Sequence, residues 1–301
     1  AAGIAPENYS LIRKGALKLY HTAETMAVAA EEADLIRGLG FQVEAIDAAA
    51  CACLEPGLAP VATSLAGGLH FKEEEVGDCR AFTRVLADRA RELGVTFRFA
   101  NEVHARVRQG ERIPAVETAN GRLEPDAVVV AAASRSAPLL RTAGLKVPVV
   151  PTKGLTISVP AAPWPDAVRS AVMDHSRLFG LIRIGDHMRV SGSAEIAGYD
   201  TTPSDRRCDA IIKNVLELFP AFQACLDAGQ QHRWAGLRGN SPDGPPIIGP
   251  TPIRNLFLDI GHGPPGRSTS AGAADVVADC VMGSKPAIDL DGLTLARFGR
   301  G

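Results

Sequence analysis

The stretch from Leu256 to Gly283 is the most informative one for chemistry, because an apolar segment, LFLDI, leads into the glycine-rich loop GHGPPG. Gly261, Gly263 and Gly266 would let a ligand approach the backbone closely, since glycine has no Cβ. The following STSAGAADVVADCVMG predicts a helix, and free N–H groups at a helix N-terminus bind negative or electron-rich atoms. The loop therefore predicts a ligand site, with an ordinary strand-to-helix turn as the alternative.

A second candidate site lies in WAGLRGNSPDGPPIIGPT, residues 234–251. Arg238 precedes the predicted turn SPDG, and arginine is well suited to bind a carboxylate through two parallel hydrogen bonds. Arg238 is therefore our candidate for carboxylate binding, and a structural ion pair is the alternative.

Other kinds of active site find little support in the sequence. The six cysteines form no C-x-x-C pair and the histidines no H-x-x-x-H pair, so we predict no metal site and reduced, scattered core cysteines. No Ser-His-Asp or Cys-His pattern points to a nucleophile. Six histidines lack a partner pattern and are predicted to be surface or core residues: His21, His70, His104, His175, His187 and His232.

Periodicity, caps and turns predict the elements that position these residues. Asp47, Asp78 and Ser204 are the predicted N-caps. Hairpin turns are expected at Asn120-Gly121 and Gly185-Asp186. Helices are predicted over 24–39, 79–94, 205–219 and 268–283, and strands over 41–46, 67–71, 95–107, 128–133 and 255–260. The run VVVAAA, 128–133, is predicted to be a strand buried on both faces.

Composition and element order restrict the fold and the partners. The 301 residues suggest about two domains. A β-rich middle between strand–helix segments suggests that these domains are interleaved in an α+β or α/β fold. A net charge of −2 gives no basic field for nucleic acid, and no 18-residue apolar run lacks a charge, which disfavours a membrane span.

Five motifs in this order resemble one known group of enzymes. They are GLHFKEEEVGDCRAFTRVLADRARELGVTF, VVPTKGLTISV, MRVSGSAEIAGYD, WAGLRGNSPDGPPIIGP with LFLDIGHGPPG, and the ending DLDGLTLARFG. This pattern resembles the flavin-dependent amine oxidoreductases of the D-amino acid oxidase superfamily, and within it the family of bacterial D-amino acid dehydrogenase small subunits. The resemblance covers nearly the whole chain.

The resemblance implies an FAD-linked oxidoreductase fold of the D-amino acid oxidase type, with two interleaved domains. Residues 72–145 and 250–301 would form the remainder of an incomplete, Rossmann-like FAD-binding domain. Residues 1–71 and 146–249 would form a mostly antiparallel β substrate-binding domain. The cofactor implied is FAD.

The resemblance also implies roles for individual residues. Cofactor contacts fall on Val103, Ala132, Ala133, Gly261, His262, Gly263, Gly266, Arg267, Ser268 and Thr269. The substrate contacts fall on Arg238, which would bind the carboxylate, and on Tyr199 and Lys153. His262, between two glycines, is expected to shape the loop, with acid–base catalysis as the alternative. The chain departs from the family pattern at Ala133, which replaces a glycine, and at Arg267, which replaces a tryptophan.

The implied reaction is oxidative deamination of an amino acid, expected to be the D-isomer, to a 2-oxo acid and ammonia. A hydride would pass from Cα to flavin N5, so the cofactor supplies the reactivity and the protein supplies orientation and electrostatics. We expect a small-molecule amino acid substrate and no nucleic acid. The expected location is cytoplasmic, with a peripheral site at the inner membrane and an electron-acceptor partner as further options.

The family's pattern begins with a βαβ unit carrying G-x-G-x-x-G, and this chain begins inside that pattern. Two alternatives to a complete enzyme therefore stay open. One is a chain that needs a partner supplying the dinucleotide-binding unit, and the other is a non-enzymatic binding domain. We expect the chain alone to bind FAD poorly and to aggregate, because VVVAAA and LFLDI would lack a neighbouring strand.

Overall fold

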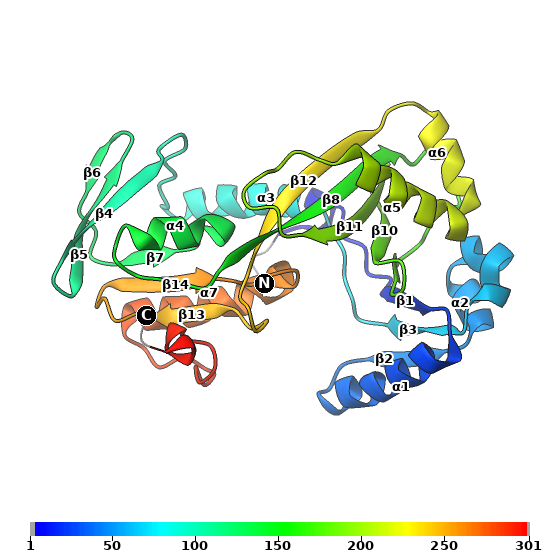
Figure 1. Cartoon of the computed structure of the whole chain (residues 1–301), viewed down its shortest axis with the longest axis horizontal. Helices are drawn as coiled ribbons and strands as arrows, with labels where there is room; N and C mark the ends of the chain where they lie inside the picture. Colours follow the sequence, from blue (N-terminus) through cyan, green and yellow to red (C-terminus); the bar gives the residue numbers. More distant parts are fainter. Residues whose placement is uncertain (1–3, 300–301) are drawn as a thin grey trace. The chain divides into compact units, whose positions relative to one another are not determined.

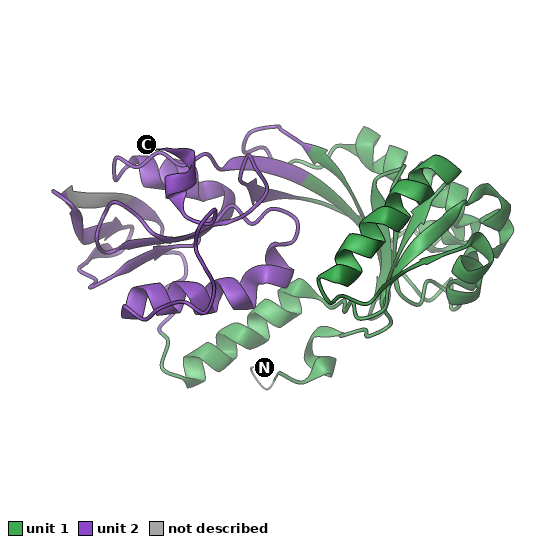
Figure 2. Ribbon diagram, turned by 90° about the horizontal axis from the view of Figure 1, so that it is seen from below, with its two compact units in different colours: residues 1–95, 154–194, 202–235 green, residues 96–153, 195–201, 236–301 purple. Residues whose placement is uncertain are grey.

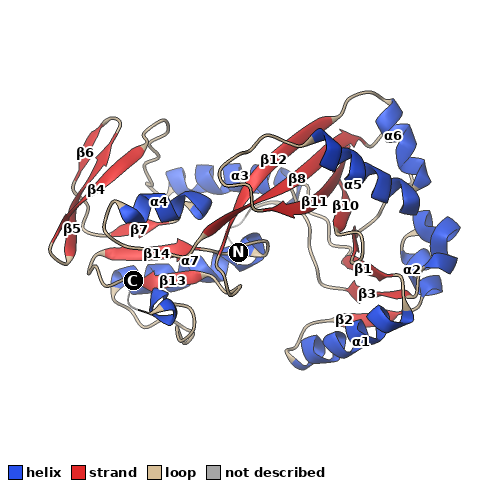
Figure 3. Cartoon of the chain, viewed as in Figure 1, coloured by secondary structure: helices blue, strands red, loops and turns tan. Residues whose placement is uncertain are grey.

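The structure is a computed structural model that describes residues 4–299, with only the backbone described at 105–108. Its contacts divide the chain into two units, each discontinuous in sequence (Figure 2). Unit 1 comprises residues 1–95, 154–194 and 202–235, and unit 2 comprises 96–153, 195–201 and 236–301. Helices alternate with largely antiparallel sheets (Figure 3), which confirms the predicted mixed α/β class.

Unit 1 contains most of an eight-stranded sheet whose order is β12-β8-β11-β10-β9-β1-β3-β2 (Figure 1). The strands are β1 Ala16–Tyr20, β2 Val43–Ile46, β3 Gly67–Phe71, β8 Val150–Pro160, β9 Ala171–Asp174, β10 Phe179–Ile184, β11 His187–Glu195 and β12 His232–Asn240. Its helices are α1 Ala23–Gly38, α2 Ala48–Leu54, α3 Cys79–Glu92, α5 Asp205–Leu218 and α6 Gln223–Asp227. Strands β1 and β9 pair in parallel, and β1 pairs with β3 in antiparallel.

Strand β1 is buried on both faces, because successive side chains point to opposite sides of a sheet. Leu17 and Leu19 belong to the large cluster that includes residues of α5. Tyr20 belongs instead to a smaller cluster with Ala29 and Ala33 of α1. Helices on the two faces therefore cover this part of the sheet.

Local sequence signals predict several helix N-termini correctly. Asp47 accepts a hydrogen bond from the Ala50 N–H at 2.7 Å, and Asp78 accepts one from the Ala81 N–H at 2.8 Å. Both are the predicted N-caps. Ser204 occupies the N-cap position of α5, but its side chain makes no capping hydrogen bond, so that detail of the prediction is wrong.

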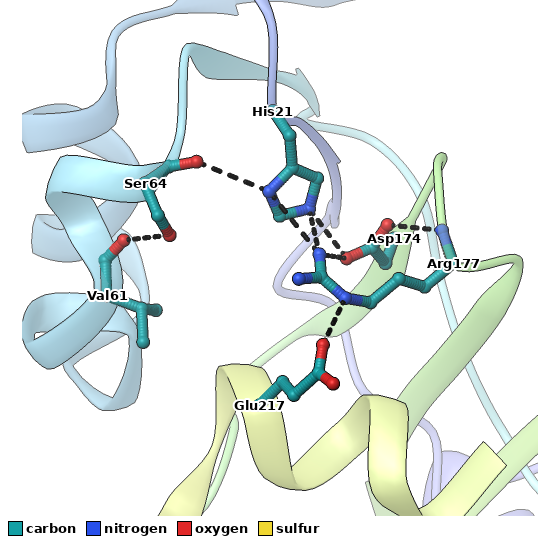
Figure 4. A network of polar contacts seen from close by, with 6 residues as sticks. All are labelled: His21, Val61, Ser64, Asp174, Arg177 and Glu217. Carbon is teal, nitrogen blue, oxygen red and sulfur yellow. Dashed lines mark hydrogen bonds and ion pairs between the residues drawn. The ribbon is translucent and has the colours of Figure 1, made fainter. Parts of the chain in front are cut away.

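A buried carboxylate is the centre of a polar network in unit 1 (Figure 4). Asp174, 2% exposed, lies 2.8 Å from Nε2 of His21 and accepts hydrogen bonds from the Arg177 backbone N–H and Nη1. Arg177 also donates from Nε to Glu217 of α5, and His21 Nδ1 lies 3.3 Å from the Ser64 carbonyl. The network satisfies a carboxylate that would be costly to bury alone.

The cysteines differ strongly in exposure, which predicts their reactivity. Burial raises the pKa of Cys51 to about 11, whereas Cys53 and Cys79 are exposed. Because the thiolate is the reactive form, we expect Cys53 and Cys79 to react rapidly with a thiol reagent at mildly alkaline pH while Cys51 stays unmodified until the protein unfolds. Peptide mass spectrometry after timed alkylation checks this, and early labelling of Cys51 would contradict it.

Among its described residues, unit 2 contains two three-stranded sheets and two α-helices. One sheet has the order β13-β14-β7 and the other β4-β5-β6. The strands are β4 Val103–Gln109, β5 Arg112–Thr118, β6 Gly121–Leu123, β7 Val128–Val130, β13 Ile247–Pro250 and β14 Leu256–Ile260, and the helices are α4 Ser136–Arg141 and α7 Gly266–Met282. Strand β14 pairs in antiparallel with β13 and in parallel with β7, and α7 packs on β13 and β14.

Two strand predictions in unit 2 need correction. Residues 95–102 are not strand, and β4 begins only at Val103. The predicted buried strand over 128–133 shortens to β7, whose Val129 is 44% exposed. Val129 is exposed because β7 lies at the edge of its sheet, where one side of the strand has no neighbouring strand within that sheet.

The two units group some segments differently from the expected domains. Residues 72–95 belong to unit 1, while 146–153 and 236–249 belong to unit 2. The assignment of cofactor and substrate roles to these segments stays a prediction.

Candidate functional site

Backbone hydrogen bonds place the glycine loop beside the end of β12. The Gly263 N–H donates to the Gly239 carbonyl at 3.0 Å, and the Ser241 N–H donates to the Gly261 carbonyl at 3.2 Å. Gly261 and Gly263 have φ of +76° and +60°, a region that favours glycine. The loop and the strand that bears Arg238 are thus joined directly.

Gly239 allows a second close approach. A Cβ at this position would lie 2.8 Å from the Ala133 carbonyl carbon and 2.8 Å from the Ser134 nitrogen, both backbone atoms. Ala133 itself has φ of +45°, which is unusual for a residue with a side chain. The end of β12 and the segment after β7 therefore meet with no room for a side chain between them.

The glycine loop, the end of β12 and the segment after β7 surround a cavity of about 310 Å³ within unit 2. Six of the predicted site residues line it: Ala133, Arg238, Gly261, His262, Gly263 and Gly266. Helix α7 begins at Gly266, and no side chain caps its N-terminus. The cavity thus combines glycine backbone, a helix N-terminus and ionisable side chains.

Arg238 is half-buried and lines this cavity. Its guanidinium has no hydrogen-bond or ion-pair partner within residues 4–299. A structural ion pair, the alternative considered from sequence, is thus not formed with any described residue. Its five N–H donors are available to an anionic ligand, for which a bidentate carboxylate is the best geometric match.

His262 is held by the carboxylate of Asp259. Its Nε2 lies 2.7 Å from Asp259 Oδ1, and its Nδ1 lies 3.3 Å from Thr269 Oγ1. Both side chains are largely buried, with 18% of the His262 and 22% of the Asp259 side chain exposed. Asp259 lines the same cavity.

Lys153 and Tyr199 make other contacts and do not line the cavity. Lys153 is 4% exposed and donates to Asp200 at 3.0 Å. Tyr199 donates to the Ser134 carbonyl at 3.2 Å, and the Arg135 guanidinium lies over its ring. These contacts anchor residues 195–201 within unit 2, and a substrate role for the two side chains stays a prediction.

The residues that line the cavity differ in part from the site residues predicted from sequence. Five further predicted residues do not line it: Val103, Ala132, Arg267, Ser268 and Thr269. Residues that sequence reasoning did not single out do line it, among them Ala131, Leu237, Gly239, Asp259 and Ser270. Leu237 and Gly239 flank Arg238, and Asp259 precedes His262 by three residues. Their closeness in sequence to predicted site residues is therefore the signal that could have found them.

The turn that follows Arg238 is held by the C-terminal segment of unit 2. Arg297 donates to both oxygens of Asp243, at 2.7 and 3.0 Å, and to the carbonyls of Pro245 and Pro246. The Arg297 hydrogen bond lowers the pKa of Asp243 below its ordinary value of 3.8. The turn is therefore fixed independently of any ligand.

Replacing Arg297 with alanine should lower the melting temperature by several degrees at neutral pH, because the turn loses charge-assisted hydrogen bonds. A carboxyl group with a depressed folded pKa stabilises the fold above its unfolded pKa, and this stabilisation is lost as the pH falls through the folded value. The difference between parent and variant should thus shrink below about pH 3.8. Thermal melts over a pH series measure it, and a difference that is independent of pH would contradict this account.

Within residues 4–299, no group of three or more His, Cys, Asp or Glu side chains is arranged to hold a metal ion. None of the described helices is both long and apolar enough to cross a bilayer.

Comparison with known proteins shows the family. The profile of the FAD-dependent oxidoreductases (DAO) matches residues 3–280. The chain belongs to this family. FAD is accordingly the cofactor, and the chain is an oxidoreductase.

Relatives of this FAD-dependent oxidoreductase include bacterial proteins named D-amino acid dehydrogenase. The protein from Sinorhizobium medicae is 39% identical over 286 residues, which are 95% of this chain and 68% of the relative. That from Granulibacter bethesdensis is 38% identical over 299 residues, which are 98% of this chain and 69% of the relative.

Solved structures show the same fold at low sequence identity. Glycine oxidase from Geobacillus kaustophilus matches with a TM-score of 0.88 and 24% identity, over 96% of this chain and 76% of that one. L-proline dehydrogenase from P. horikoshii also matches with a TM-score of 0.88, at 19% identity, over 98% of this chain and 79% of that one. The D-amino acid oxidase type of fold expected from sequence is therefore confirmed.

The cavity of this FAD-dependent oxidoreductase suits part of a flavin. Gly239, Gly261 and Gly263 line the cavity with backbone and no side chain, so a ring system can lie against the main chain there. The uncapped N-terminus of α7 favours an electron-rich edge. Asn240 Oδ1, which is buried with no donor among the described residues, lies next to Gly263 of the glycine loop. The residues present thus fit the cofactor.

Proposed function

We propose that this chain catalyses FAD-dependent oxidation of a D-amino acid to a 2-oxo acid and ammonia. The observation that carries the proposal is Arg238, a half-buried guanidinium without a partner in the described chain, in a glycine-lined cavity at a helix N-terminus. An amino acid offers the carboxylate that such a guanidinium binds. The preference for the D-isomer is supported by the names of relatives 37–39% identical to the chain.

The chain's own residues supply binding and electrostatics. Arg238 binds the substrate carboxylate and so orients Cα, and the glycine loop gives the cofactor ring access to the backbone. The N-terminus of α7, which no side chain caps, would hold an electron-rich edge of the bound cofactor and favour negative charge there. When bound, FAD accepts the hydride from Cα.

Anaerobic mixing of the flavin-loaded protein with single amino acid enantiomers tests the proposal. We expect D-amino acids to bleach the oxidised flavin spectrum, L-enantiomers to leave it unchanged, and 2-oxo acid and ammonia to form in equal amounts. Bleaching by dithionite but by no amino acid would refute the proposal. Hydrogen peroxide formation on readmitting air would identify oxygen as an electron acceptor, and its absence would favour a quinone or protein partner at the inner membrane.

A second candidate is a chain of the same fold that needs a partner supplying a dinucleotide-binding unit. It is favoured by β7, an edge strand whose Val129 is 44% exposed. A groove lined by Val129 and by the α7 residues Ala274, Val277 and Met282 adjoins that edge. An edge strand beside apolar surface is a ready place for another strand to pair.

Thermal melts with increasing FAD distinguish the two candidates, because a ligand that binds only the folded state raises stability once its concentration passes Kd. The partner-dependent chain should show little rise alone. A large rise should appear after addition of a separate βαβ unit with G-x-G-x-x-G. A large FAD-dependent rise for the monomeric chain alone would rule out the second candidate.

A further inference from the structure

The proposed reaction requires the amino group of the substrate to lose a proton, and Arg238 cannot accept it. An amino acid arrives at neutral pH mainly as an ammonium, whose nitrogen has no lone pair to assist departure of a hydride from Cα. A proton acceptor in the cavity would meet this need. His262 and Asp259 are the other two titratable side chains that line it.

The Asp259 contact fixes which nitrogen of His262 is available. An ionised carboxylate only accepts hydrogen bonds, so Nε2, 2.7 Å from Asp259 Oδ1, bears the hydrogen in the neutral ring. The lone pair is then on Nδ1. Its contact with Thr269 Oγ1 is long, 3.3 Å, and Thr269 is exposed. The arrangement resembles the orientation of a histidine base by a carboxylate in other enzymes.

The loop itself restricts His262. A Cβ at Gly266 would lie 2.9 Å from His262 Cβ, and residue 262 forms an isolated β-bridge with Asn240. The histidine backbone is therefore held between α7 and the end of β12. Its imidazole is placed by packing as well as by Asp259.

We propose that His262 is the base that takes the proton from the substrate ammonium, and that Asp259 is its positioning residue. One N–H bond of the ammonium breaks, its electron pair stays on nitrogen, and the proton bonds to His262 Nδ1. The products of this step are a neutral amine and an imidazolium that still donates from Nε2 to Asp259. The positive charge moves from substrate to His262, and no electrons are gained or lost. This inference rests on the proposed function.

Charged side chains of three elements lie near this dyad. Asp259 extends from β14 and contacts the ring, and Arg238 at the end of β12 lines the same cavity. Arg267 lies in the first turn of α7, next to Gly266. A bound substrate carboxylate would offset the positive charge of Arg238 within this cavity.

The test compares the rate of anaerobic flavin reduction in the parent and in His262→Gln as the pH is lowered. A histidine base works only while Nδ1 is unprotonated, so the parent rate should fall toward acidic pH. His262→Gln should be slowed by about 100-fold or more and should lose that acidic decrease. Asp259→Asn should retain flavin and be slowed by about tenfold. Equal rates and equal pH profiles in parent and His262→Gln would overturn the proposal.

A matched control is available in unit 1. His187 also lies against an aspartate, with Nδ1 2.6 Å from Asp186 Oδ1, but at an exposed hairpin turn. His187→Gln should leave the reduction rate and its pH profile unchanged. A similar loss in this variant would mean that the effect at His262 is not specific, and would overturn the assignment.

A measurement independent of turnover uses ¹⁵N-labelled 2-methylalanine, an amino acid without a hydrogen on Cα. Its bound ¹⁵N signal should be that of a neutral amine in the parent and of an ammonium in His262→Gln and Asp259→Asn. The same ammonium signal in the parent and both variants would overturn the proposal. If the parent flavin is bleached by amino acids yet the variants match it, only the dyad fails; if no amino acid bleaches it, the proposed function fails as well.

Discussion

Replacing Arg238 with alanine should weaken substrate binding by roughly 10- to 100-fold while the flavin content stays close to that of the parent. Arg238 has no partner in the described chain, so its removal leaves no carboxylate of the protein unpaired. The loss is then that of a charge-assisted hydrogen bond to the ligand, about 1.5–3 kcal/mol. Steady-state kinetics should show it as a higher KM, with the oxidised spectrum intact.

Arg238→Lys should recover little of this loss, because a lysine ammonium cannot form the planar bidentate contact. Arg254→Ala is the matched control, since Arg254 is a largely exposed arginine of the same unit paired with Glu111. It should bind substrate like the parent. An unchanged KM in Arg238→Ala would remove this residue from the substrate site.

Replacing Gly263 with valine should reduce flavin retention strongly without unfolding the chain. Gly263 has φ of +60°, and a Cβ there would lie 2.9 Å from Asn240 Oδ1. A β-branched residue in this backbone region costs about 1–3 kcal/mol, and its side chain would push against Asn240 and so shift the loop that lines the cavity. Absorbance ratios of flavin to protein after gel filtration measure retention, and circular dichroism reports the fold.

Gly272→Ala is the control for the glycine loop. Gly272 lies within α7, and a Cβ there would meet nothing within 4 Å. Alanine should therefore keep the flavin and stabilise the helix by about 0.5–1 kcal/mol. If Gly263→Val also keeps its flavin, the loop is a turn without a close ligand contact.

Features that depend on neighbouring residues were determined by the sequence alone. The N-caps Asp47 and Asp78, the hairpin at Gly185-Asp186 and the glycine that ends α7 all depend on contacts within a few residues. Gly283 has φ of +73°, the left-handed conformation expected of a glycine after a helix. The glycine loop and α7 were predictable for the same reason, because strand, loop and helix are consecutive.

The tertiary structure alone decided which of these features meet. Arg238 and the glycine loop are separated in sequence and come together through backbone hydrogen bonds between Gly239 and Gly263. Asp259 lies within β14, and the packing of the sheet decides on which face of the strand its side chain meets His262. Lys153 is paired with Asp200, which comes from another segment of the chain. The exposure of Val129 follows from the position of β7 at a sheet edge. A residue's type and spacing define what chemistry it can do, but pairing of distant strands defines its neighbours, because such contacts depend on the packing of the whole unit.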